Sequence, residues 1–267
     1  MKIALAKAFA VLGAVFLQSL QKNEDSSPDF SKKGSITLEF DNTYAGSELV
    51  LGRANIKPTG ETVTVKQIKY IISNIVLIKT DGTQHAYPKG ESYFIVDETN
   101  PESLSVTLKN IPAGNYAKIK FGVGVDREQF EKGAAGQGDF LAKAQAADLI
   151  WSWSAGYKFL AFEGSFTAAQ ASEEMPFMIH TGRAGTDYNY RDMTLDLPDA
   201  AEVKSGSAAQ IRMVADISKI TDGPNKILLV DHNDMGMGAT IMGGATLPQV
   251  TANLGGMFQA TAVRSKH

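Results

Sequence analysis

The sequence predicts an all-β protein, an antiparallel β-sandwich of about nine or ten strands with long loops and little helix. Three observations predict it. Short segments alternate apolar and polar residues with the period of two that is typical of strands. Turn-forming residues separate these segments about every 10 to 20 residues. Amphipathic helices, which a parallel α/β fold needs between its strands, are missing. No repeat of fixed period and no internal linker is found, so one domain over residues 34–267 is expected.

The N-terminus differs from the rest of the chain. Lys2 and Lys7 precede an apolar run at residues 8–17. This pattern predicts a secretory signal peptide over residues 1–21, with a buried first helix as the alternative. The end of this segment resembles a lipoprotein signal, but the chain has no Cys to carry a lipid, a disulfide or a thiolate-bound metal. Residues 22–33 are polar and predict a flexible linker. We therefore expect an exported protein of the periplasm or outer envelope of a Gram-negative bacterium, associated with the envelope through its N-terminus if its relatives are lipidated.

The first half of the domain contains the clearest strand patterns. Ile36, Leu38 and Phe40 alternate with polar residues, and a run rich in β-branched residues covers residues 62–79 before the Asp81-Gly82 turn. Residues 41–60 predict a long connection. Two further alternating segments flank the turn at residues 110–114, so an antiparallel hairpin with one wet face is expected. The strands expected in this half cover residues 35–40, 62–79, 93–96, 104–108 and 117–125.

The second half begins with a glycine-rich loop at residues 126–138 and the best helical stretch, residues 139–148. An aromatic strand follows over residues 151–164, and the glycine at its interior break predicts a bulge or a close backbone approach. The last segment is expected to be a turn followed by a strand. The remaining strands are expected within residues 176–180, 193–197, 211–217 and 252–263, with an edge at 226–230.

Composition and motifs exclude several classes of function. The net charge is −3, which argues against a nucleic-acid-binding protein. No Walker loop, zinc-protease motif or nucleophile elbow occurs, and Gly122-Val-Gly124 lacks the third glycine of a dinucleotide-binding loop. Paired carboxylates such as Asp126 with Glu128 or Glu163 are the weakest candidates for catalysis, because no spacing distinguishes them from surface residues. An enzyme is therefore not expected.

The candidate metal ligands are histidines and methionines. His180 ends an alternating segment and faces the side opposite Phe177 and Ile179, a position suited to binding copper or zinc. His232 lies in a loop with Met235 and Met237, whose soft thioethers favour Cu(I), and His85 is a further imidazole. Each of these residues also has an ordinary structural interpretation, as a hydrogen-bonded histidine or as a methionine packed on the sandwich.

The aromatic strand supplies a second kind of candidate. Trp151 and Trp153 are the two tryptophans of the chain, and Tyr157 follows them. They are expected either in the core of the sandwich or as an exposed platform that stacks on a sugar or peptide.

Several segments, in this order, resemble the MbnP family of copper-associated periplasmic proteins, which is related to CorA of methanotrophs. Their order and spacing carry the resemblance, which covers most of the chain after the signal peptide. The segments are residues 68–77, 96–98, 111–116, 119–126, 151–159, 163–164, 177–182 and 253–258.

This resemblance implies an exported β-rich protein that binds copper with help from histidines. It also implies that a partner di-haem oxidase of the MbnH type oxidises a tryptophan, Trp151 or Trp153, to kynurenine. His180 is the histidine that matches best, whereas Asp41-Asn42 stands where relatives often carry a histidine near the first strand.

Three functions follow from these observations. The first is copper binding through His180, assisted by His85 or His232 and an oxidised tryptophan. The second is a metal-free envelope module that uses Trp151, Trp153 and Tyr157 as its platform. The third is a protein that serves only as the substrate of the tryptophan-oxidising partner.

Overall fold

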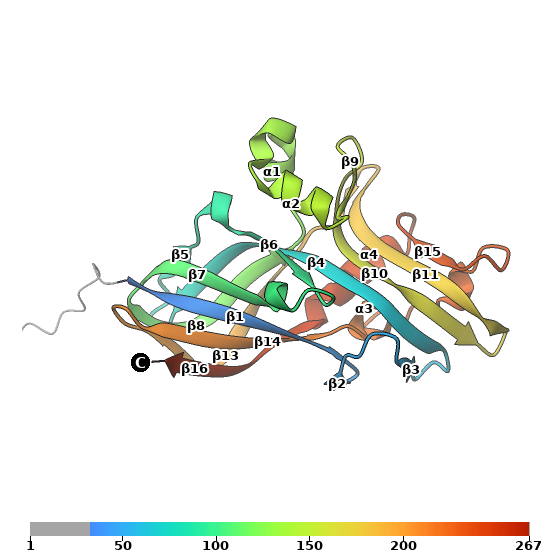
Figure 1. Ribbon diagram of the computed structural model, residues 1–267, viewed down its shortest axis with the longest axis horizontal. Helices are drawn as coiled ribbons and strands as arrows, with labels where there is room; N and C mark the ends of the chain where they lie inside the picture. The colour runs from blue at the N-terminus through green and yellow to red at the C-terminus, as the bar shows by residue number, and fades with distance from the viewer. Residues whose placement is uncertain (1–32, 267) are drawn as a thin grey trace, which may run out of the picture.

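The computed structural model describes residues 33–266 of the chain, which are drawn in colour in Figure 1. The predicted signal peptide at residues 1–21 lies outside the described residues. So does the predicted linker, apart from Lys33, which already belongs to the first strand.

Two sheets form the body of the protein (Figure 1). The first has the order β16-β14-β1-β2, with β7 also paired to β1, and the second follows the path β12-β11-β10-β4-β8-β13. The first sheet comprises β1 (Lys33–Tyr44), β2 (Ser47–Glu48), β7 (Ser105–Pro112), β14 (Ala208–Asp216) and β16 (Phe258–Lys266). The second comprises β3 (Ala54–Ile56), β4 (Thr62–Lys79), β5 (Gln84–Ala86), β6 (Tyr93–Asp97), β8 (Gly114–Val123), β9 (Ile150–Ser152), β10 (Gly156–Ala168), β11 (Ala171–Ala184), β12 (Asp187–Tyr188), β13 (Arg191–Val203) and β15 (Ala239–Ile241).

The predicted all-β sandwich is confirmed. Of the strands within residues 33–266, ten have five or more residues, in agreement with the predicted nine or ten, and six others have only two or three. Most pairs are antiparallel, whereas β1–β14 and β11–β15 are parallel. The helices are short: α1 (Arg127–Glu131), α2 (Phe140–Ala146), α3 (Lys219–Asp222), α4 (Leu247–Asn253), η1 (Lys89–Glu91), η2 (Pro101–Leu104), η3 (Ala134–Gln137), η4 (Val230–His232) and η5 (Leu254–Gly256). None of the described helices is long and apolar enough to cross a membrane.

The main core lies between the two sheets, and the period of two in the sequence builds it. Ile36, Leu38 and Phe40 of β1 are buried, as predicted, and they face the buried side chains of the second sheet. Burial of these side chains removes apolar surface from water, which is the main force that holds the two layers together.

Strand β4 organises the second sheet. Along one edge, its first half pairs with β10 and its second half pairs with β8. The two partners diverge near Ile71, and the chain that joins them, residues 124–155, carries α1, α2 and β9 (Figure 1). This segment covers the outer face of the sheet and encloses a second, smaller core of Ile71, Val125, Phe140, Ala144, Leu149, Tyr157, Phe159 and Ala161. We refer to residues 124–155 as the cap.

Two local predictions are wrong. The expected hairpin between residues 104–108 and 117–125 does not form, because β7 pairs with β1 and β8 pairs with β4 and β13. The turn between them crosses from one sheet to the other, so that both apolar faces point into the same core. The expected edge at residues 226–230 is also not a strand, since it makes only an isolated bridge from Asp222 to Lys226. Its apolar residues Ile227 and Leu229 are buried in a loop instead.

Candidate functional site around His180

His180 lies on β11, near the point where the cap meets the second sheet. Phe177 and Ile179 are buried in the main core, so Met178 and His180 face outward, as the sequence pattern predicts. His180 pairs with Ala161 of β10, which belongs to the second core. The histidine is therefore on the outer face of the sheet and yet only 3% exposed.

Glu163 of β10 holds one nitrogen of this imidazole. Nε2 of His180 is 2.7 Å from Oε1 of Glu163, and a carboxylate only accepts hydrogen bonds, so Nε2 carries the proton. The pairing of β10 with β4 shifts register between Glu163 and Gly164. Such a bulge redirects side chains next to functional sites. A Cβ at residue 164 would lie 2.0 Å from the backbone oxygen of Thr64, so only glycine fits at this bulge.

The other nitrogen of the ring, Nδ1, is buried and has no hydrogen-bond partner within residues 33–266. Burial lowers the pKa of His180, and Glu163 only partly opposes this effect. The imidazole is therefore neutral at neutral pH. With the proton on Nε2, Nδ1 presents a free lone pair, which is the form in which histidine binds a metal.

Trp151 packs beside His180. It lies on β9, which pairs with the start of β10, and the two ring centroids are 6.1 Å apart at 49°. Gly182 makes this approach possible, because a Cβ there would lie 2.9 Å from the Trp151 ring and 2.5 Å from the carbonyl oxygen of Tyr157. Trp151 is half-buried, so part of its indole is accessible to solvent.

Trp153 has a different environment. It lies in the turn between β9 and β10, where Gly156 adopts a φ of +95°, and its ring stacks on Phe130 with centroids 5.0 Å apart. Tyr157 meets it edge-on at 6.3 Å and is itself fully buried. Arg183 extends the stack, with its guanidinium 5.6 Å from the Phe130 ring and a hydrogen bond to the Ser154 carbonyl. Trp153 thus packs within the cap, whereas Trp151 contacts the histidine.

The other two candidate histidines lie elsewhere. His85 is on β5 opposite Leu77 of β4, whereas the row that contains His180 crosses β4 at Lys69. Eight residues of strand separate the two rows, which corresponds to about 26 Å. His232 ends η4, before β15. No group of three or more His, Asp or Glu residues that would hold a metal is found in the described part of the chain.

The candidate methionines lie on the surface. Met235 and Met237 occupy the turn before β15 and are 92% and 69% exposed, so they do not pack on the sandwich. Met178, which belongs to no ligand motif of the sequence, is 39% exposed and lies two residues before His180 on the same face of β11. The alternation of β11 was the signal that would have identified it.

Asn42 and Asp126, two polar residues considered from the sequence, have structural roles. Asn42, where the family resemblance led us to expect histidine, accepts a hydrogen bond from Tyr70 and donates one to Glu98, so both the oxygen and the nitrogen of its amide are bonded. Asp126 caps α1 through the backbone N–H of Gln129. Burial raises the pKa of Asp126, but hydrogen bonds, chiefly from Asn74, Lys89 and Tyr93, outweigh this and lower it to about 2.

The comparison with protein families decides the classification. The MbnP family model matches residues 33–241, which is most of the 267-residue chain. The chain belongs to the MbnP family. The matched region includes β9, β10 and β11, and therefore Trp151, Glu163 and His180.

A solved structure is also similar to this MbnP-family chain. MbnP from Methylosinus trichosporium is 13% identical, with a TM-score of 0.47, and the match covers 80% of this chain and 82% of that one. A search of curated proteins finds no significant match.

Proposed function

We propose that this MbnP-family protein is an exported copper-binding protein that holds the metal at Nδ1 of His180. The observation that carries the proposal is the state of this imidazole, which is buried and neutral, with Nε2 bonded to Glu163 and Nδ1 without a partner in the described residues. Copper binds imidazole nitrogen well, and a carboxylate on the second ring nitrogen fixes the tautomer and makes the ligand more basic.

Trp151 is the residue that would complete the site after oxidation. Its indole faces the His180 ring, whereas Trp153 is stacked within the cap. Two peroxide equivalents at a di-haem partner would deliver two oxygen atoms to C2 and C3 of the indole and leave as two waters. The C2–C3 bond breaks in this step, and hydrolysis then releases C2 as formate. The product, kynurenine, keeps the benzene ring of the indole and carries an aniline nitrogen and a ketone oxygen where the five-membered ring stood.

Met178 adds a soft ligand to the same face. Met178 lies two residues before His180 on β11, and its thioether side chain is partly exposed. A thioether with an imidazole favours Cu(I), whereas nitrogen and oxygen ligands favour Cu(II). The proposed site would thus combine one imidazole with one thioether, and kynurenine formation would shift its preference toward Cu(II).

Copper titration of purified protein tests the proposal. The wild-type protein is compared with His180→Ala and with the matched control His85→Ala, with Cu(I) and Cu(II) measured separately by competition with a chelator. We expect His180→Ala to lose binding and His85→Ala to keep it, while circular dichroism shows that both are folded. Equal copper affinity in the wild type and His180→Ala would rule out this site.

Binding measurements and mass spectrometry distinguish copper binding from the two alternative functions. A protein that serves only as an oxidase substrate would gain kynurenine at a tryptophan yet bind no copper in either form. A metal-free module would bind a sugar or peptide on exposed rings, but Tyr157 is buried and only Trp151 and Trp153 retain accessible surface. We propose a binding role rather than an enzymatic one, in the periplasm or outer envelope, for which the predicted signal peptide at residues 1–21 is the support.

A further inference from the structure

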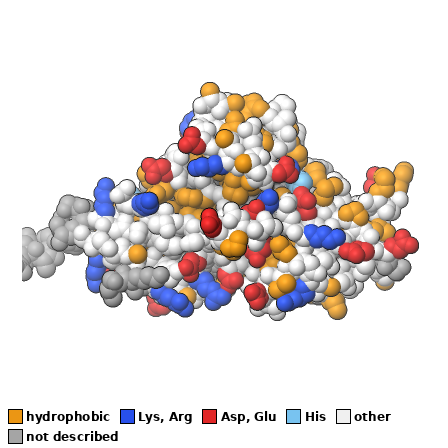
Figure 2. All heavy atoms as spheres, in the orientation of Figure 1, with side chains coloured by type: hydrophobic (Ala, Val, Ile, Leu, Met, Phe, Trp, Pro, Cys, Tyr) orange, Lys and Arg blue, Asp and Glu red, His pale blue; other side chains and the backbone are white. Residues whose placement is uncertain are grey.

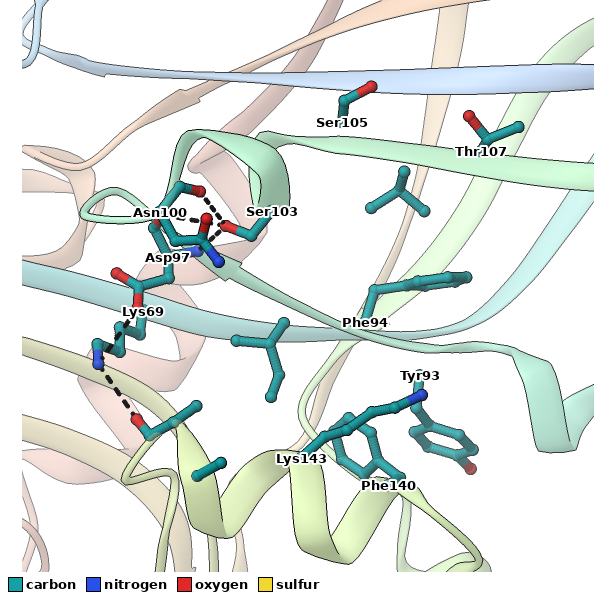
Figure 3. Close-up of a pocket in the computed structure, with 14 residues that line it drawn as sticks. Lys69, Tyr93, Phe94, Asp97, Asn100, Ser103, Ser105, Thr107, Phe140 and Lys143 are labelled. Carbon is teal, nitrogen blue, oxygen red and sulfur yellow. Dashed lines mark hydrogen bonds and ion pairs between the residues drawn. The ribbon is translucent and has the colours of Figure 1, made fainter.

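A groove lies on the outer face of the protein between β6, the η2–β7 segment and α2 (Figure 3). Its volume is about 620 Å³, within the range of sites that enclose a small organic ligand. Figure 2 shows hydrophobic side chains gathered on this face below the cap helices. The residues that line it include no histidine, so it is distinct from the copper site proposed above.

The floor of the groove is apolar and largely aromatic. It runs along the edge of β6 that pairs with no other strand of the described residues, so Phe94 and Ile95, which point to opposite faces of β6, both border it. Phe140 comes from the first turn of α2. The Phe140 ring packs on Tyr93 with centroids 5.3 Å apart, and the Tyr93 hydroxyl is held by Asp126 at 2.8 Å. Because these contacts hold the Phe140 and Tyr93 rings in place, this part of the groove is a preformed apolar surface for a flat ligand.

The charges in the groove do not balance. Lys69 is paired with Asp97 at 3.2 Å and also donates to the carbonyl of Ala147 at 3.2 Å. The side chain of Lys143 has no hydrogen bond or ion pair within residues 33–266, and it runs along the groove toward Tyr93 in Figure 3. One positive charge is therefore left over at the edge of an aromatic floor.

The opposite wall supplies hydroxyl groups. Ser105 and Thr107 lie on the exposed face of β7, and the hydroxyl of Thr107 is hydrogen-bonded to that of Thr37 at 3.0 Å. The groove thus combines an apolar floor, one unpaired cation and a small number of polar groups, which is the usual composition of a site for a small organic ligand.

We propose that this groove binds a small organic carboxylate with a flat, apolar body. The body lies on Phe94, Ile95 and Phe140, and the carboxylate pairs with the ammonium of Lys143. The unbalanced charge selects an anion, and the aromatic floor selects an apolar ring system over a hydrated inorganic ion. A charge-assisted hydrogen bond at the edge of an apolar surface is stronger than the same bond in open water.

Isothermal titration calorimetry of the copper-free protein with naphthoate, and with its uncharged analogue naphthamide, tests this proposal. We expect naphthoate to bind and naphthamide to bind about tenfold more weakly or not at all. Lys143→Gln should weaken naphthoate binding by a similar factor, and Ser105→Trp, which fills the groove from its rim, should abolish it. Lys118→Gln is the matched control, because Lys118 is an exposed lysine of β8 that does not line the groove.

Three results would overturn the proposal: no binding of naphthoate to the wild-type protein, equal binding of both probes, or unchanged affinity in Lys143→Gln. Lys143 is on the surface of a short helix, so its variant tests the site even if Ser105→Trp does not fold. Since the titration uses no metal, its outcome is independent of whether His180 binds copper.

Discussion

His180 and Glu163 lie on neighbouring strands and share a hydrogen bond of 2.7 Å on the outer face of the second sheet. Glu163 is 29% exposed at its side chain, whereas the side chain of His180 is only 4% exposed, so the carboxylate connects the buried imidazole to solvent. This bond orients the ring and leaves Nδ1 free.

Replacing Glu163 with Gln should weaken the proposed copper binding without abolishing it. The amide no longer enforces the tautomer in which Nδ1 is free, and loss of such a supporting carboxylate typically lowers metal affinity about 10- to 100-fold. Competition titration with a copper chelator measures the change. Glu128→Gln is the control, because Glu128 is an exposed carboxylate of α1 outside the site. Wild-type affinity in Glu163→Gln would show that the bond has no role in metal binding.

The stability of the metal-free protein should decrease as the pH falls below about 6.5. Burial lowers the pKa of His180 from its ordinary value of 6.5, so the unfolded state takes up a proton at a higher pH than the folded state. Unfolding is therefore favoured as pH drops through 6.5 toward the lower folded pKa, and the contribution of His180 is complete only above 6.5.

Urea unfolding of the wild type and of His180→Gln, at several pH values on both sides of this range, measures the effect. The variant should lose this part of the pH dependence. A parallel decline of the two free energies of unfolding would contradict the assignment.

Trp151 should be the tryptophan that a di-haem partner converts. Its ring is half-buried beside His180, whereas the Trp153 ring is stacked on Phe130 and met edge-on by Tyr157. After co-expression with such a partner, peptide mass spectrometry of Trp153→Phe should still show kynurenine, and Trp151→Phe should show none. Conversion confined to Trp153 would reverse this assignment.

Lys57→Met should destabilise the fold strongly. Lys57 and Glu61 form a buried ion pair at 2.6 Å, in which Lys57 also donates to the carbonyl of Ile227 and Glu61 accepts from the backbone of Val230. Removing one partner leaves a buried charge, at a cost of about 3–5 kcal/mol in the free energy of unfolding.

Lys66→Met provides the comparison, since Lys66 and its partner Glu174 are both 60% exposed. That change should cost less than about 1 kcal/mol by urea unfolding. Similar losses in the two variants would show that the Lys57–Glu61 pair does not anchor the loop before β15.

The sequence does not show which strands pair with each other. The alternation in residues 104–108 and 117–125 correctly indicates two strands, but it contains no information on their partners. The two strands join different sheets because each then buries its apolar face in the common core. Lys57 and Glu61 likewise hold residues 227–230 as a buried loop where the pattern of apolar residues suggested an edge strand.

The alternation of apolar and polar residues was enough to place the long strands, the inward and outward faces of β1 and β11, and therefore the outward direction of His180. These features are local, because a period of two places alternate side chains on opposite faces whatever the partner strand is. Three other features depend on the tertiary structure. Glu163 forms a hydrogen bond with His180, and Trp151 and Trp153 lie in different environments because a turn precedes β10. The side chain of Lys143 remains unpaired beside an aromatic floor. Each of these contacts depends on strand register, a bulge or the docking of the cap, which are set by packing between segments distant in the chain.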